Sequence, residues 1–494
     1  MPARWADAAG GVSRLASGAL PLCLGWLCLA GLGMAPRRLE AQALELRGNL
    51  RIRTEAWDWF TPSVPADESY AFVGTILRGG IGAQRPRYAW RVDLAVPILL
   101  GLPDNAVAPP PQGQLGLGAT YRAENGKQEV GLLVKQAFVR LRLGRQAGAA
   151  TLRLGRFEFN DAEETEPRNP ALSLLKRSRI AQRLIGSFAF THVGRSFDGI
   201  ELARSSPGAN FTLIAVKPTE GVFQLDGLAE LDAGLVYVAL TKALFDAGAE
   251  GRLFALYYRD GRGVLKTDNR PAAVRALDSQ NIGVATLGAH YLHTFPMGPG
   301  MGDVLLWGAW QTGDWGEQRH GAVAVAAELG YRPREIPLNP WLRAGYFHGR
   351  GDDSPGDDSH QTFFQVMPTP RPFARVPFYN LMNVRDVFAQ ILLRPSARWT
   401  LQADAHALRL AEPNDLWYSG GGAFDDESFG FVGRPGGGAR SLAGLFDVSV
   451  DYHPSPRFGA TLYLGRVRGD DVVRAVYPQG SGATFAYLEL RRQF

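Results

Sequence analysis

Cysteine is almost absent from this sequence. The 494-residue chain has two cysteines, Cys23 and Cys28, and both lie in one apolar segment near its beginning. Residues 44–494 therefore offer no disulfide framework, no thiol nucleophile and no thiolate metal site. A chain of this length without cross-links must be stabilised by side-chain packing and by backbone hydrogen bonds.

Several other signals are missing as well. After residue 43 no run of 18 consecutive apolar residues occurs, which excludes further transmembrane helices. The eight histidines are scattered, and neither H-E-x-x-H nor G-x-S-x-G is present, so the motifs of zinc proteases and serine hydrolases are lacking. The net charge of +5 is too small to indicate a nucleic-acid partner. No cofactor is predicted.

The N-terminal apolar segment has the features of a secretory signal. Arg4 and Arg14 precede a 17-residue apolar segment at 19–35, and Ala41-Gln42-Ala43 follows as a small-x-small cleavage site. Seventeen residues are at the lower limit for a membrane-spanning helix. We therefore predict a signal peptide at 1–43 and an exported domain at 44–494.

The exported part shows strand periodicity throughout. In LELRGNLRIR, from Leu44 to Arg53, leucine and isoleucine alternate with arginine, glutamate and asparagine. The same pattern recurs in stretches of about ten residues. Eighteen strands are predicted in this way, near 44–57, 68–82, 87–100, 130–144, 149–159, 193–204, 209–217, 232–242, 250–259, 281–293, 302–312, 320–332, 339–348, 384–393, 398–409, 442–453, 456–467 and 482–494.

The connections between these segments alternate in length. Short ones such as RQAG, SSPG and RPSA have the Gly, Pro and Ser chemistry of tight turns. Long ones fall near 101–129, 160–192, 218–231, 260–280, 349–383, 410–441 and 468–481, and the clearest exception to the alternation is 313–319. Alternating loop lengths and half-apolar strands are typical of a transmembrane barrel with short periplasmic turns and long extracellular loops. The predicted fold is therefore an all-β, antiparallel, up-and-down barrel of about 18 strands, surrounded by lipid in a Gram-negative outer membrane.

The last segment is predicted to close the barrel. ATFAYLELRRQF alternates towards Phe494, and its pairing with 44–57 would leave no open sheet edge. An alternating strand with a terminal aromatic residue resembles the signature by which outer-membrane barrels are recognised for assembly. The barrel-assembly machinery is therefore an expected partner, through Phe494.

Arginine dominates the positions predicted to face the lumen. Strand alternation places seven arginines there, interleaved with acidic residues: Arg47, Arg51, Arg91, Arg140, Arg142, Arg153 and Arg343. One interpretation is a solvated lumen with compensated charge. The other is a conduit for an anionic solute, because the guanidinium fork binds carboxylates. Such a pore would prefer anions, most strongly in dilute salt.

Several motifs resemble those of the alginate export family of outer-membrane porins. They are RGNLRIRTEAWDWF in the first strand, LGRFEFND at 154–161, GRSFDGIELAR at 194–204, and the Gly-Asp loop at 348–370 that leads into NLMNVRDV. The resemblance implies an eighteen-stranded barrel with an arginine-rich pore. Its solute would be an anionic polysaccharide, such as alginate, or another organic anion.

The resemblance also implies site residues. It marks as lumen or constriction groups Arg156, Glu158, Arg195, Asp198 and Asp386. Strict alternation along 152–158 would instead turn Arg156 and Glu158 towards lipid. Bulges at Gly155 and Gly199 would return these side chains to the lumen.

One loop is rich in acidic residues. Calcium prefers such oxygen ligands, and the cluster consists of Asp352, Asp353, Asp357 and Asp358. Its spacing matches no EF-hand, so a solvated outer loop is the simpler interpretation and no metal site is predicted.

The sequence therefore predicts a passive outer-membrane channel for anionic organic solutes or anionic polysaccharide, and not an enzyme. Three different functions remain open: a general porin for small organic nutrients, an outer-membrane barrel enzyme that acts on glycan or lipid, and a plugged barrel whose loops bind a surface partner. Conductance in a planar bilayer separates a channel from a plugged barrel, and product formation from candidate glycans separates an enzyme from a conduit.

We expect the mature protein to begin at Leu44, because Ala41-Gln42-Ala43 immediately precedes the first alternating strand. N-terminal sequencing of protein isolated from the outer membrane measures this directly. A start at Pro36, or an intact Met1, would contradict the expected cleavage site.

Overall fold

The computed structural model describes residues 44–146, 148–369 and 374–494. Within this part of the chain eighteen strands form one closed antiparallel barrel, since the 19-stranded sheet also counts the two-residue strand β16. The barrel strands are β1 (Glu45–Asp58), β2 (Ser69–Gln84), β3 (Tyr88–Leu100), β6 (Leu133–Arg142), β7 (Thr151–Phe157), β8 (Phe197–Ser206), β9 (Ala209–Pro218), β10 (Ala233–Leu244), β11 (Ala249–Asp260), β12 (Ile282–Met297), β13 (Gly300–Trp315), β14 (Gln318–Pro333), β15 (Trp341–Gly349), β17 (Val384–Ser396), β18 (Trp399–Leu410), β21 (Ser441–Ser455), β22 (Phe458–Gly469) and β23 (Gly482–Gln493). Each predicted segment overlaps one of them, so the predicted all-β barrel is confirmed.

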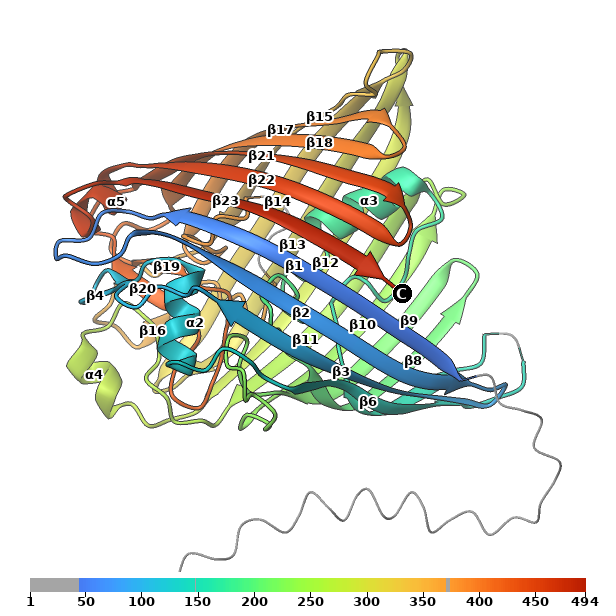
Figure 1. Ribbon diagram of the computed structural model, residues 1–494, viewed down its shortest axis with the longest axis horizontal. Coiled ribbons are helices and arrows are strands. Elements are labelled where there is room, and N and C mark those ends of the chain that lie inside the picture. Colours follow the sequence, from blue (N-terminus) through green and yellow to red (C-terminus); the bar gives the residue numbers. More distant parts are fainter. Residues whose placement is uncertain (1–43, 147, 370–373) are drawn as a thin grey trace, which may run out of the picture. The chain divides into compact units, whose positions relative to one another are not determined.

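The first and last strands close the barrel. β1 pairs with β23 from Asn49 opposite Gln493 to Asp58 opposite Thr484, and the two strands lie side by side in Figure 1. On its other side β1 pairs with β2 along its whole length. Every strand of the barrel wall therefore has two hydrogen-bonded neighbours.

Alternation sorts the side chains of each strand between two environments. On β1 the outward Leu46 and Ile52 are 76% and 36% exposed, whereas the inward Arg53 and Glu55 are 1% and 0% exposed. The inward face is not uniformly polar, because Trp57 is also buried there. The interior is therefore a packed protein core with charged groups embedded in it, rather than an open, water-lined tube.

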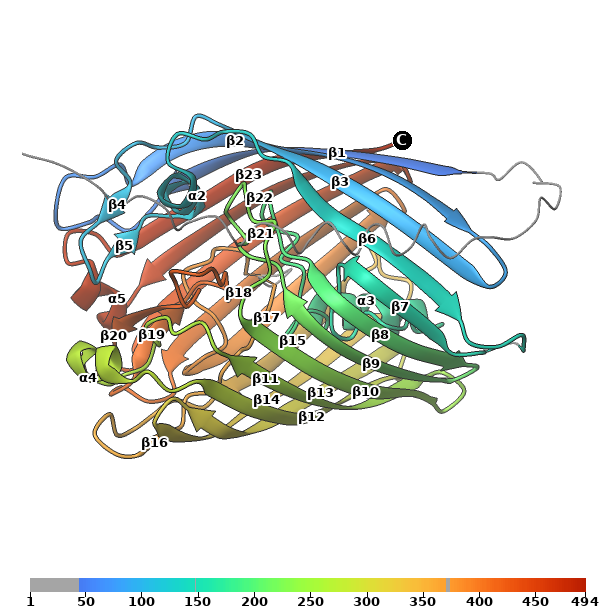
Figure 2. The same cartoon turned by 90° about the horizontal axis from the view of Figure 1, so that it is seen from below.

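The long connections gather at one end of the barrel and the short turns at the other (Figures 1 and 2). The predicted exception at 313–319 is the short turn between β13 and β14, which joins Trp315 to Gln318. The long loops contain β4 (Val107–Ala108), β5 (Gly113–Gln114), α2 (Leu117–Asn125), α4 (Ala272–Leu277), β16 (Ser359–His360), β19 (Leu416–Ser419), β20 (Val432–Pro435) and α5 (Asp471–Val476). Among the described residues, no helix is long and apolar enough to cross a membrane.

One long connection, which we call the inner loop (residues 158–196), folds into the barrel. Its helix α3 (Pro170–Arg179) begins at the cap Asn169, whose side chain accepts a hydrogen bond from the Ala171 N–H. Lys176 Nζ lies 2.9 Å from Glu250 Oε1 of β11, and Arg179 Nε lies 3.0 Å from Glu328 Oε2 of β14. These buried ion pairs fix the helix against strands β11 to β14.

The N-terminal signal peptide predicted at 1–43 lies outside the described residues. The described chain starts at Leu44, and β1 begins at the next residue, Glu45. The strand predicted at 44–57 therefore agrees with β1.

We expect deletion of Phe494 to reduce barrel assembly more than it alters any pore that has formed. The Phe494 N–H donates to the Gly48 carbonyl, and a Cβ on Gly48 would lie 2.9 Å from the Phe494 ring. The residue therefore extends the closing pair of strands beyond β23. Protein abundance in the outer membrane and single-channel conductance are the two measurements, with Phe494→Tyr as the control that keeps an aromatic ring. Normal abundance of the deletion variant would refute this role.

Candidate functional site

A basic cavity lies inside the barrel at the short-turn end. It has a volume of about 490 Å³ and is bordered by β1, β2, β3, β6 and β23 together with the inner loop. Its charged lining residues are Arg47, Arg51, Arg78, Arg91, Asp93, Lys135, Glu158 and Arg491. Six cations and two carboxylates give a net charge of 6 − 2 = +4. The partners Glu45 and Glu489 behind the lining and the C-terminal carboxylate of Phe494, which also lines the cavity, reduce this to 4 − 3 = +1, which is still an excess of positive charge.

Glycine on β2 makes room for this cavity. The stretch Arg78-Gly79-Gly80 of β2 lies between β1 and β3 in the barrel wall. Gly80 is directly opposite Asp93 of β3. A Cβ on Gly80 would lie 2.0 Å from Asp93 Oδ1, so no side chain fits there. The missing side chains leave space for charged groups from three strands to approach one another.

The two carboxylates of the cavity are held by arginine. Arg78 donates two hydrogen bonds to Glu158, at 3.1 and 2.9 Å, and Arg91 Nη2 lies 2.6 Å from Asp93 Oδ2. Burial alone would raise the pKa of Glu158, but Arg78 and Lys135 hold it below its usual value. Both carboxylates are therefore committed to ion pairs, and the cationic side chains of the lining outnumber the acidic ones.

The inner loop divides the barrel interior at residues 187–194, which we call the partition. Ser187, Ala189 and Thr191 line the basic cavity. Phe188 and Phe190, on the opposite face of the same segment, line a second cavity of about 210 Å³ at the long-loop end. Because residues of the same short segment line both cavities, the partition lies between them.

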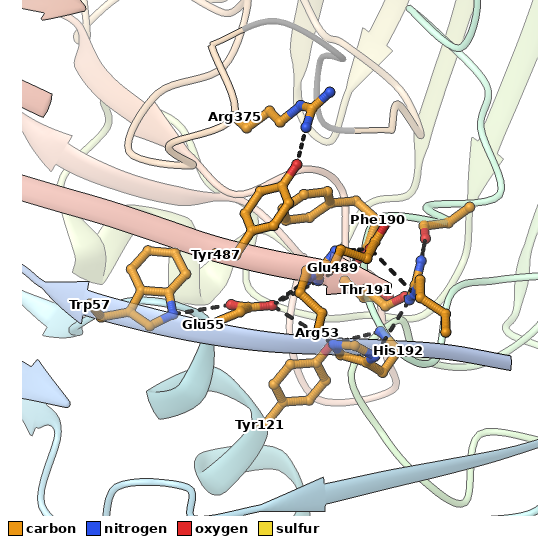
Figure 3. Close-up of polar contacts among 12 residues, drawn as sticks. Arg53, Glu55, Trp57, Tyr121, Phe190, Thr191, His192, Arg375, Tyr487 and Glu489 are labelled. Atoms are coloured by element: carbon orange, nitrogen blue, oxygen red, sulfur yellow. Dashed lines mark hydrogen bonds and ion pairs between the residues drawn. The ribbon is translucent and has the colours of Figure 1, made fainter. Parts of the chain in front are cut away.

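Two arginines of β1, Arg51 and Arg53, hold the partition in place. Figure 3 shows Arg53 beside Phe190 and Thr191. Arg51 donates to the carbonyls of Ala189, at 2.6 Å, and of Thr191, and Arg53 Nη2 donates to the Phe190 carbonyl at 2.7 Å. The Arg53 guanidinium also lies 4.2 Å from the centroid of the Phe190 ring. Three consecutive carbonyls that would otherwise be buried without partners are thus satisfied by side chains from the barrel wall.

Glu55 holds the Arg53 side chain in position. Arg53 Nε donates to Glu55 at 2.8 Å, and the Trp57 indole N–H donates to the same carboxylate at 3.0 Å (Figure 3). His192 of the partition packs against Gly74 of β2, where a Cβ would lie 2.1 Å from its ring nitrogen. Burial lowers the pKa of His192 to about 3, so its imidazole is neutral at ordinary pH.

Four of the residues predicted as lumen groups meet in the basic cavity: Arg47, Arg51, Arg91 and Glu158. Glu158 arrives there without a bulge. β7 ends at Phe157, and the chain then turns inward, so strand alternation no longer applies to Glu158.

Other predicted lumen residues lie inside the barrel but outside this cavity. Arg153 pairs with Glu201, and Arg343 pairs with Asp303 and, at 3.0 Å, with Glu328. Arg140 is opposite Arg153 on β6, and Arg142 Nη2 donates to the Gln146 carbonyl of the short turn at 2.9 Å. Arg153 and Arg343 therefore belong to ion pairs, and Arg142 lies at a short turn at the end of the barrel.

Two residues implied by the family resemblance have structural partners within the barrel. Arg195 is 1% exposed, its guanidinium lies 3.4 Å from the carbonyls of Pro368 and Gly421, and burial lowers its pKa to about 9. Asp386 faces inward on β17 and pairs with His406 at 3.0 Å. Neither lines the basic cavity.

The assignment of Arg156 and Asp198 to the lumen is corrected by the structure. They are opposite one another on β7 and β8, with Gly155 opposite Gly199 and no shift of register. The hypothetical bulges are therefore absent from this pair of strands. Both side chains share the outward face with Leu154 and Ile200, which are each 39% exposed, and they form an ion pair there at 2.5 Å.

The acidic loop is organised by local hydrogen bonds. Asp352 Oδ1 accepts from the Ser354 N–H at 3.0 Å, and Asp357 Oδ1 accepts from the Ser359 hydroxyl at 2.8 Å. Burial raises the pKa of Asp352 to about 6. Among the described residues, no group of three or more His, Cys, Asp or Glu side chains is placed to hold a metal ion.

Four important cations were not among the predicted site residues: Arg53, Arg78, Lys135 and Arg491. Arg78 shares the inward face of β2 with Phe72 and Ile76, so its strand lacks the polar inner face that marks a lumen. Lys135 lies where the register between β3 and β6 shifts, and its Nζ donates to the Val193 carbonyl at 3.0 Å. An arginine at an inward position next to apolar inward residues is the sequence feature that could have identified Arg78 as a site residue.

The fold is shared with solved outer-membrane channels. Acinetobacter baumannii OccAB4 superposes with a TM-score of 0.54 at 10% identity, over 92% of this chain and 99% of that one. Acinetobacter baumannii OccAB2 gives 0.54 at 10% identity, over 91% and 98%. Pseudomonas aeruginosa OpdK, crystallised with vanillate, gives 0.51 at 11% identity, over 91% and 98%. At such identities the similarity shows the fold alone.

No curated protein matches this sequence significantly. The model of the alginate export family matches residues 132–486, which is most of the barrel and includes the inner loop with its partition. The predicted resemblance is thereby confirmed, and the chain belongs to the alginate export family.

Proposed function

We propose that this protein is an outer-membrane channel for small organic anions, and that the basic cavity is its binding site. The supporting observation is the excess of cations around a space of about 490 Å³. Arginine binds carboxylates through a planar fork with several donors. A low-dielectric wall around fixed positive charges also concentrates anions from solution.

Cavity size favours a small solute over a polymer. A volume of about 490 Å³ is within the range of small-molecule sites. An extended polysaccharide would need a continuous passage, whereas the partition separates the two cavities at residues 187–194. OpdK, which has the same fold, was crystallised with vanillate, a small organic anion. Export of an anionic polysaccharide such as alginate remains a second candidate, favoured by the family match.

A barrel enzyme and a general porin have less support. An enzyme acting on glycans needs two carboxylates free for acid and base roles, but Asp93 and Glu158 in the cavity are both paired with arginine. A general porin would need no net charge in its narrow region. The family and the structural neighbours are channels of the outer membrane, which supports transport as the function and a Gram-negative outer membrane as the location.

We expect Arg78→Gln together with Arg91→Gln to abolish most of the anion preference of the pore. The two changes lower the side-chain charge of the lining from +4 to +2, and with Glu45, Glu489 and the Phe494 carboxylate counted, from +1 to −1. The reversal potential in a planar bilayer under a salt gradient is the measurement. The preference should be strongest in dilute salt, because the Debye length is about 10 Å at 0.1 M and about 3 Å at 1 M.

Arg142→Gln is the matched control for this test. Arg142 lies at the short turn, outside the cavity lining, and should leave the reversal potential nearly unchanged. A cation-selective wild type, or a double variant that is as anion-selective as the wild type, would contradict the proposed site.

We expect Arg53→Met combined with Glu55→Gln to release the partition and raise the conductance. The pair of changes removes the bond to the Phe190 carbonyl without leaving a lone buried charge. A hydrogen bond to a charged group stabilises by about 1.5–3 kcal/mol. The fraction of molecules in which the partition is displaced should therefore rise roughly 10- to 150-fold. Arg153→Met with Glu201→Gln removes another inward ion pair, between β7 and β8, and serves as the control. Equal conductance of the two double variants would show that Arg53 does not hold the partition.

A further inference from the structure

A row of polar and glycine residues crosses the outward face of the barrel near its long-loop end. The strand registers place Arg156, Asp198 and Lys217 side by side, and likewise Gly234, Arg259, Gly283, Asp314 and Arg319. The two sets meet at a groove that Lys217 and Gly234 both line. Leucine, valine and isoleucine dominate the outward positions below this row, for example Leu240 and Leu253 at 52% and 64% exposure. The row therefore marks the upper boundary of the apolar belt.

Within this row Gly234 forms the floor of a groove. The groove has a volume of about 400 Å³ and lies between Lys217 of β9 and Arg259 of β11. A Cβ on Gly234 would meet nothing closer than the Val216 carbonyl at 3.7 Å, so the space above it is open. Because any larger residue would fill this space, the groove exists because position 234 is glycine.

The two basic residues of the groove are free to bind a ligand. Arg156 and Asp198 neutralise each other, with Nε–Oδ1 at 2.8 Å. Lys217 and Arg259 are exposed and, among the described residues, neither has a side-chain hydrogen bond or an ion pair. The exposed Asp232 borders the same groove and adds a hydrogen-bond acceptor. Two free cations beside one carboxylate suit a ligand that carries both phosphate and hydroxyl groups.

The lower wall of the groove is apolar and aromatic. Val236 and Tyr257 are 48% and 49% exposed on the outward face, and they are opposite one another in the register of β10 and β11. A Cβ on Gly283 would lie 3.1 Å from the Tyr257 hydroxyl, so that hydroxyl reaches up to the level of the polar row. A tyrosine with its ring among apolar residues and its hydroxyl at a polar level is typical of a membrane interface.

We propose that this groove binds the phosphorylated sugar headgroup of a glycolipid in the outer leaflet, with an acyl chain along Val236 and Tyr257. The inference rests on the proposed outer-membrane location, which places the long-loop end at the outer surface. The outer leaflet of that membrane is built of phosphorylated glycolipids. Lys217 and Arg259 bind the phosphate, and Asp232 accepts hydrogen bonds from sugar hydroxyls.

Binding of bis-phosphorylated lipid A to the purified full barrel in neutral detergent tests this directly, by native mass spectrometry and by titration. The wild type should bind it, and Lys217→Gln with Arg259→Gln should weaken binding roughly 30-fold, from about fivefold per lost surface cation. Lipid A with both phosphates removed should bind the wild type as weakly as bis-phosphorylated lipid A binds the double variant. Gly234→Leu should also block binding, because it fills the groove without changing any charge.

Lys242→Gln is the matched control. Lys242 is an exposed residue on the same strand, β10, but it lies near the short-turn end, so its loss should leave glycolipid binding unchanged. Equal binding by the wild type and the Lys217/Arg259 double variant, or an equal loss on Lys242→Gln, would overturn the proposal. The double variant should retain wild-type anion selectivity in a bilayer, since its changes lie outside the lumen. A barrel that binds lipid A but does not conduct anions would refute only the proposed channel function. A barrel that conducts anions but does not bind lipid A would refute only the proposed glycolipid site.

Discussion

The whole structure depends on one constraint, which is that every backbone amide of a strand in hydrocarbon must find its partner within the protein. The pairing of β1 with β23 satisfies it for the two strands that would otherwise be edges. Closure in turn fixes which side chains point inward. In a strand paired on both sides, side chains alternate strictly, so no single residue can change the side to which it points. The arginines of β1 thus face the interior as a consequence of closure.

Charge inside this barrel is costly unless it is compensated, and most of it is. Lys176, Arg179 and Arg343 are buried and paired with acidic residues of the opposite wall or a neighbouring strand. These pairs attach α3 to one side of the barrel. The basic cavity is different, because its cations outnumber its carboxylates and because glycines of β2 leave space between them. The combination of open space and unbalanced charge separates a binding site from structural ion pairs.

Arg51 and Arg53 connect the wall of the barrel to the partition. Arg51 lines the basic cavity and also donates to two carbonyls of the partition. An anion that enters the cavity would compete with those carbonyls for the same guanidinium. The basic cavity and the partition therefore share a residue, and on the proposed function an anion bound in the cavity would be coupled to the stability of the partition.

Strand number, strand direction and the inward position of Arg47, Arg51 and Arg91 were determined by the sequence alone, because period-two alternation and a closed sheet allow only one arrangement. Alternation also identified the outward direction of Arg156 correctly, whereas the motif resemblance placed it inside. Only the tertiary structure decided which inward charges meet. Glu158 reaches Arg78 because β7 ends one residue earlier, and the partition lies where the inner loop crosses the interior. Contacts between a long loop and a distant strand depend on packing in three dimensions, and no local pattern along the chain encodes them.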